Sequence, residues 1–171
     1  MRATVLVAGI GNVLLSDDGF GVEVARRLAA HRDALPPSVE IVDIGIRGIH
    51  LAYRMLDGYQ TVLLIDTVQR GGDPGQLYLL EHDLEQPVEP DPLDSHGMNP
   101  AAVLTTLRAL ASSVGVERPV QRVLVVGCEP LVLDEGLGLS DPVAAAVEPA
   151  VRTVIDLVNH ALTTEVTTQT T

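Results

Sequence analysis

The chain has 171 residues, which suits one compact domain, and 46% of them are hydrophobic, enough for a core although only 2% are aromatic. Its net charge is −12 and every basic residue is an arginine, so the acidic surface repels phosphate backbones and excludes nucleic acid as a partner. A single cysteine, Cys128, rules out an intrachain disulfide and favours a reducing compartment. No stretch approaches the roughly 18 apolar residues of a membrane helix, and the short apolar run near the N-terminus indicates a strand rather than a signal peptide. We therefore expect a cytoplasmic monomer that does not enter membranes.

Apolar runs along the chain predict strands that alternate with helices. We expect strands at residues 4–8, 39–44, 61–65, 76–80 and 121–127, and helices at residues 17–31, 48–56, 100–110 and 140–162. The third strand is continuously apolar, which is typical of a parallel strand covered on both faces, whereas the fourth is predicted to be an antiparallel edge strand. The fold class is therefore α/β, a three-layer sandwich around a mostly parallel twisted sheet. We assign residues 1–163 to one domain and residues 164–171 to a disordered tail.

Acidic residues stand where the predicted strands end. Asp17 and Asp18 follow the first strand, Asp43 ends the second, and Asp66 directly follows the third. In open α/β sheets, sites form outside the carboxyl ends of the strands, and the proline-rich loop that carries His96 should open on the same edge. Each residue alone has a structural alternative, as a helix cap, a turn residue or a solvated histidine. Their convergence on one edge favours a functional site.

Two carboxylates and an imidazole would form a three-ligand metal site with open positions. Oxygen and nitrogen ligands suit zinc or nickel but do not identify the metal, which could be carried by the protein or presented by a partner. Other nucleophiles have little support, since the chain has no G-x-S-x-G motif. Cys128 follows a predicted strand with no histidine nearby in sequence, so we predict a buried, inert thiol.

Residues 9–22, with the sequence GIGNVLLSDDGFGV, resemble the opening signature of the hydrogenase maturation proteases. The resemblance continues in order through residues 43–45, the strand ending at Asp66, and residues 95–97, 127–130 and 138–143. It spans nearly the whole chain. Residues 43–47 depart from the Gly-Gly-Thr version of this loop in the family, and the resemblance makes the loop a candidate determinant of cleavage specificity. Cys128 stands where an aliphatic residue is more usual in the family.

The resemblance implies an endopeptidase that removes the C-terminal extension of a nickel-iron hydrogenase large subunit after nickel insertion. It implies a metal-binding trio of Asp18, Asp66 and His96, through which the protease senses nickel presented by its substrate. Asp43 matches a further acidic position of the site, so the implied catalytic residues are these four. Zinc or another divalent ion could occupy the site in the isolated protein. The metal could act as a Lewis acid or only as a recognition handle.

Three alternatives are weighed against this interpretation. A dinucleotide-binding enzyme would explain Gly9 and Gly11 between a strand and a helix, but Leu14 replaces the third glycine and acid lies where a pyrophosphate would sit. A peptidyl-tRNA hydrolase shares the G-x-G-N turn, yet Val13 and Leu14 replace its Pro-Gly and the acidic chain does not suit tRNA. A non-catalytic metal-binding maturation chaperone could use the same ligands, and the sequence leaves it open.

Overall fold

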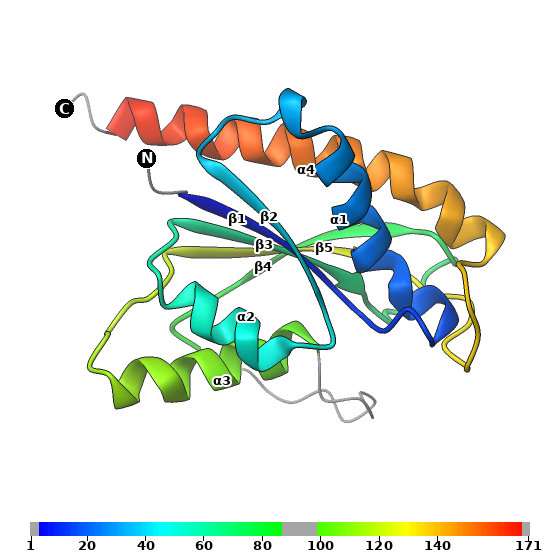
Figure 1. The fold of residues 1–171 in the computed structure, drawn as a ribbon, viewed down its shortest axis with the longest axis horizontal. Coiled ribbons are helices and arrows are strands. Elements are labelled where there is room, and N and C mark those ends of the chain that lie inside the picture. The colour runs from blue at the N-terminus through cyan, green and yellow to red at the C-terminus, as the bar shows by residue number, and fades with distance from the viewer. Residues whose placement is uncertain (1–3, 87–98, 169–171) are drawn as a thin grey trace.

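The structure is a computed structural model that describes residues 4–86 and 99–168, with side chains described up to residue 162. Its centre is a five-stranded sheet in the order β2-β1-β3-β5-β4 (Figure 1). The strands are β1 (Val5–Ile10), β2 (Val39–Gly45), β3 (Thr61–Thr67), β4 (Leu77–His82) and β5 (Arg122–Cys128). All pairings are parallel except that of β4 with β5 at the edge. The predicted α/β class with an antiparallel edge strand is confirmed.

Helices cover both faces of the sheet (Figure 1). On one face lie α1 (Phe20–Ala30) and α4 (Asp141–Thr168), and on the other lie α2 (Gly48–Met55) and α3 (Pro100–Ser113). Two short 3-10 helices, η1 (Ser16–Gly19) and η2 (Arg32–Ala34), flank α1. Within the described part of the chain, no helix is both long and apolar enough to span a membrane.

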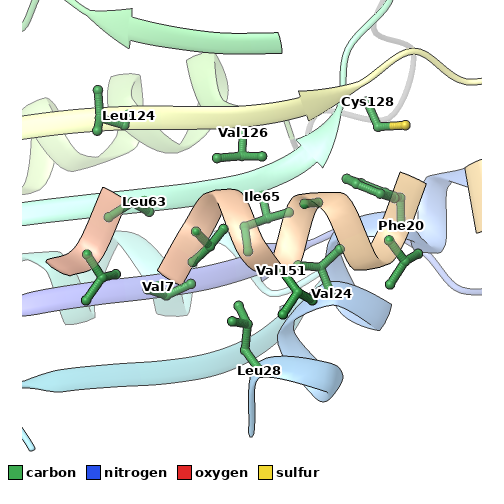
Figure 2. Close-up of a cluster of buried hydrophobic side chains, with 14 of the residues drawn as sticks. Val7, Phe20, Val24, Leu28, Leu63, Ile65, Leu124, Val126, Cys128 and Val151 are labelled. Carbon is green, nitrogen blue, oxygen red and sulfur yellow. The ribbon is translucent and has the colours of Figure 1, made fainter. Parts of the chain in front are cut away.

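The strands send alternate side chains to two apolar clusters, as the period of a strand requires. In β1, Val5 and Val7 point to the α1 and α4 side, while Leu6 and Ala8 point to the α2 and α3 side. Figure 2 shows the first cluster, in which strand side chains pack against Phe20, Val24 and Leu28 of α1 and Val151 of α4. Residues of β3 such as Leu63 and Leu64 are fully buried, which explains why residues 62–65 of this strand are all apolar.

The predicted element boundaries differ from the structure near the N-terminus. β1 continues through Gly9 to Ile10, beyond the predicted end at residue 8. Residue 9 is a glycine inside the strand because α1 crosses there so closely that a Cβ would lie 2.2 Å from the carbonyl oxygen of Gly21. The first α-helix begins at Phe20, and Asp17 and Asp18 lie in the preceding η1 instead of its first turn. The predicted helix start was therefore too early.

At the other end, α4 runs to Thr168, past the end predicted near residue 162. Residues 164–168 of the predicted tail are thus helical. The proline-rich loop assigned to residues 86–100 falls largely within residues 87–98, outside the described residues. The helix that follows this loop begins at Pro100, with the side chain of Asn99 accepting a hydrogen bond from the Ala102 N–H as its cap.

Candidate active site at the carboxyl edge of the sheet

The topological switch point of the sheet lies between the carboxyl ends of β1 and β3. β1 lies between β2 and β3, and the helices that follow β1 and β2 cover opposite faces of the sheet. The connections beyond β1 therefore diverge, which is the arrangement that opens a binding crevice in α/β sheets. Asp18 follows β1, and Asp66 lies in β3 one residue beyond Ile65, which pairs with Gly9.

Two carboxylates of the predicted trio meet at this edge. One Asp18 oxygen, Oδ2, accepts a hydrogen bond from the Asn12 N–H at 2.7 Å, and Oδ1 accepts one from the Thr67 hydroxyl at 3.3 Å. Asp66 is buried, and its Oδ1 accepts a hydrogen bond from the Thr67 N–H at 2.7 Å. Asp18 and Asp66 are thus connected through a single residue, Thr67, which the sequence analysis did not single out.

Close packing of α1 brings Asp18 to this position. A Cβ on Gly21 would lie 2.1 Å from the carbonyl oxygen of Ile65 and 2.3 Å from that of Ile10. The first turn of α1 therefore rests directly on the ends of β1 and β3, and only glycine allows this approach. This contact explains the second glycine of the G-x-G at residues 19–21 of the sequence motif.

Asp17 has a different role from Asp18. It is fully buried and accepts hydrogen bonds from the N–H groups of Leu131, Val132 and Ser140 and from the Ser140 hydroxyl, at 2.7–2.9 Å. Burial alone would raise the pKa of Asp17, but these hydrogen bonds outweigh it and hold the pKa below its usual value. Neither η1 nor α1 has a side-chain cap, so the helix-cap alternative is wrong for this pair.

Asp17 thereby ties the loop after β1 to the loop after β5, which lie side by side in Figure 1. Backbone hydrogen bonds reinforce the contact, since Ser16 N–H donates to Gly136 and the Gly136 N–H donates to Leu14. Ser16 adopts a φ of 50°, a left-handed conformation that is uncommon outside glycine. The loop that carries Asp18 is consequently held from two sides.

Of the two remaining predicted site residues, the structure describes only Asp43. Asp43 is exposed on β2, and β1 separates that strand from β3. Its carbonyl oxygen accepts a hydrogen bond from the Arg47 guanidinium at 2.7 Å, and it takes no part in the contacts that connect Asp18 with Asp66. His96 lies outside the described residues, and among those described no three acidic, histidine or cysteine side chains are grouped to hold a metal ion. The metal trio stays a prediction.

A third buried carboxylate, that of Glu129, was not among the predicted site residues. It accepts hydrogen bonds from the N–H groups of Arg70 and Gly71 and from the Tyr78 hydroxyl, at 2.9–3.2 Å. Burial would raise its pKa, but these donors hold the pKa below the usual range. Glu129 thus anchors the loop after β3 to the end of β5. Its signals in the sequence were its place next to a predicted strand end and its position within the matching residues 127–130.

We expect Cys128 to be unreactive in the folded protein. Its thiol is fully buried, and burial together with the charges of Asp17 and Glu129 raises the pKa of Cys128 to about 12. Since the thiolate is the reactive form, iodoacetamide at pH 8 should label the native protein at least about 100-fold more slowly than the urea-unfolded chain. Mass spectrometry measures both rates. Rapid labelling of the native protein would contradict the prediction of an inert thiol.

Comparison with known proteins identifies the family of the chain. The family model of the hydrogenase maturation proteases matches residues 22–157. The hydrogenase 2 maturation protease of Escherichia coli is 30% identical over 151 residues, which cover 88% of each chain. The crystal structure of a hydrogenase 2 maturation peptidase from a Thaumarchaeota archaeon is 34% identical, with a TM-score of 0.68 and coverage of 93% of this chain and 99% of the other. An Escherichia coli endopeptidase solved in solution is 30% identical, with a TM-score of 0.72 and coverage of 94% of both chains. The chain belongs to the hydrogenase maturation protease family and is a peptidase.

Proposed function

We propose that this peptidase removes the C-terminal extension of a nickel-iron hydrogenase large-subunit precursor after nickel has been inserted. Family membership supports a substrate from hydrogenase maturation, as the name of the Escherichia coli relative states for that protein. The observation that carries the proposal is the pair of carboxylates, Asp18 and Asp66, connected through Thr67 at the carboxyl ends of β1 and β3.

The chemistry of this pair suits a metal offered by a substrate. An ionised carboxylate has about four lone-pair positions, more than the hydrogen bonds from Asn12 and Thr67 occupy on Asp18. Oxygen ligands from Asp18 and Asp66 together with the imidazole of His96 would suit nickel or zinc. We assign these three residues to grip the substrate's nickel, which would align the adjacent peptide bond at the edge of the sheet.

Hydrolysis then requires a water molecule and a proton acceptor. The water oxygen would attack the carbonyl carbon of the aligned peptide, a carboxylate would take the water proton, and that proton would pass to the leaving amine as the C–N bond breaks. Asp43 is our candidate for the acceptor, because it is exposed at the same edge and outside the connected pair. The nickel would supply orientation and could also polarise the carbonyl.

The test compares nickel-loaded and nickel-free precursor by intact mass. We expect the wild-type protein to remove a C-terminal peptide from the loaded precursor only. Asp18→Asn, Asp66→Asn and His96→Ala should each slow cleavage by about 100-fold or more, because even partners that only orient metal ligands are worth 10- to 100-fold. Asp33→Asn is the matched control, since it removes the same charge from an exposed residue of η2 before β2, at the opposite end of that strand.

Other outcomes have defined meanings. Equal cleavage of loaded and nickel-free precursor would contradict nickel sensing but would support cleavage of the precursor by this protein. Tight binding of the loaded precursor without any loss of mass would favour the maturation chaperone instead. Neither binding nor cleavage of any large-subunit precursor would contradict the proposed substrate.

A further inference from the structure

Thr67 makes two hydrogen bonds that converge on the proposed site. Its N–H donates to Asp66 Oδ1 at 2.7 Å, and its hydroxyl donates to Asp18 Oδ1 at 3.3 Å. We propose that Thr67 is a positioning residue, which sets the relative placement of Asp18 and Asp66 for binding a divalent metal ion. The inference rests on the metal-gripping role of the two carboxylates in the proposed function.

The backbone of Thr67 is fixed by the sheet, so its N–H and hydroxyl can hold the carboxylates of Asp66 and Asp18 in place. Thr67 ends β3 and pairs with Cys128 of β5, and the next residue, Val68, donates its N–H to the Cys128 carbonyl at 3.0 Å. The β-branched side chain has restricted χ1 freedom, so the direction of its hydroxyl is restricted as well. Asp66 belongs to the same strand and needs no further support to stay beside Thr67.

Asp18 depends more on this contact. It lies in η1, a single short 3-10 turn in the connection between β1 and α1, not in the sheet. Of its two described side-chain hydrogen bonds, the one from Asn12 N–H comes from the same connection, 6 residues away. Only the one from Thr67, 49 residues away, ties the carboxylate to β3. Loss of the Thr67 hydroxyl would therefore leave the Asp18 side chain bonded only within its own loop, so that its carboxylate could rotate relative to Asp66 while the loop backbone stays held.

The size of the effect follows from the geometry. A hydroxyl bonded to a carboxylate is charge-assisted, but 3.3 Å is longer than the usual distance of about 2.6 Å for such bonds. Partners that orient metal ligands change metal affinity or activity by about 10- to 100-fold when they are removed. For this long hydrogen bond we expect the lower end of that range.

The experiment compares Thr67→Val, which keeps the shape and loses the donor, with Thr67→Ser, which keeps the donor. Two readouts are used: Ni²⁺ affinity of the protein alone by calorimetry, and the single-turnover cleavage rate of nickel-loaded precursor. Thr67→Val should weaken at least one of them by about 10-fold, and Thr67→Ser should stay within about twofold of wild type. Urea unfolding midpoints of both variants show whether stability accounts for the difference.

Each other result overturns the inference. Wild-type behaviour of Thr67→Val in both readouts means that the hydroxyl does not position Asp18. An equal loss in Thr67→Ser and Thr67→Val points to side-chain packing rather than the hydroxyl. If the wild-type protein cleaves no precursor, the proposed function is contradicted, and the Ni²⁺ affinities alone test the role of Thr67. Equal Ni²⁺ affinities of wild type and Thr67→Val, or no Ni²⁺ binding by any of the proteins, would contradict that role.

Discussion

Replacing Gly21 with alanine should reduce the free energy of unfolding by about 3 kcal/mol and reduce cleavage along with it. The added Cβ would lie 2.1 Å from the Ile65 carbonyl oxygen and 2.3 Å from that of Ile10, closer than any real contact. Both oxygens belong to the backbone of central strands, so α1 would have to lift away from the sheet. Overpacking a core costs about 1–3 kcal/mol and occasionally more, and a clash with backbone on two strands belongs at the upper end.

Two further consequences bear on the size of this effect. Lifting α1 separates Phe20, Val24 and Leu28 from the apolar cluster in Figure 2, which adds to the loss. The better helix propensity of alanine offsets at most about 1 kcal/mol. Asp18, which immediately precedes Gly19 and α1, would move with the helix, so the variant should lose cleavage activity even where it remains folded.

Urea unfolding at pH 7 measures the change, with Ala29→Ser as the control. Ala29 is exposed on the same helix, so this substitution adds one atom where there is room and should shift stability by no more than about 0.5 kcal/mol. If Gly21→Ala unfolded at the same urea concentration as Ala29→Ser, the close approach of α1 to the strand ends would be refuted.

Asp17→Asn should also destabilise the protein by about 3 kcal/mol. The aspartate accepts hydrogen bonds on both oxygens, Oδ1 from the Ser140 N–H and Oδ2 from Leu131, Val132 and the Ser140 hydroxyl. Asparagine has only one acceptor oxygen, so its NH₂ group must face at least one buried N–H. Hydrogen bonds to a charged group contribute about 1.5–3 kcal/mol each, and a buried donor left without an acceptor costs about 1–3 kcal/mol.

The same variant should change the response to acid. Because the pKa of Asp17 is lower in the folded than in the unfolded protein, the unfolded chain binds more protons between the two values. The contribution of Asp17 is therefore fully present above the unfolded pKa of about 3.9 and is lost as the pH falls through the folded pKa. Between pH 5 and pH 2, wild type should lose more stability than Asp17→Asn, although Glu129 gives both proteins some acid sensitivity.

Urea unfolding at several pH values tests both parts of this prediction. Asp33→Asn, an exposed change of the same charge, is again the matched control and should remain close to wild type. Parallel acid profiles for wild type and Asp17→Asn, with similar stability at pH 7, would mean that Asp17 does not hold the loop after β5.

Family membership agrees with the grounds in the sequence against the two rival enzyme classes. Gly9 and Gly21 allow α1 to pack closely on the strands, and the family match identifies a peptidase rather than a nucleotide-binding or tRNA-cleaving enzyme.

The sequence by itself determined the sheet, its helices and the edge at which the acidic residues gather. This was possible because burial on both faces imposes a local apolar pattern, as in the run from Val62 to Ile65, and because strand ends are marked by polar residues such as Asp66. Fold class and edge strand therefore follow from short stretches of chain.

Only the tertiary structure decided what each acidic side chain does. Asp17 and Asp18 are neighbours with the same chemistry. Asp17 accepts hydrogen bonds from Ser140, 123 positions away, and so holds two loops together. Asp18 accepts one from Thr67, 49 positions away, which connects it to Asp66. Asp43 shares the edge but is set apart by the strand β1. The role of a carboxylate depends on which hydrogen-bond donors contact it in the folded chain. Contacts between residues far apart in sequence leave no periodic pattern from which they could be predicted.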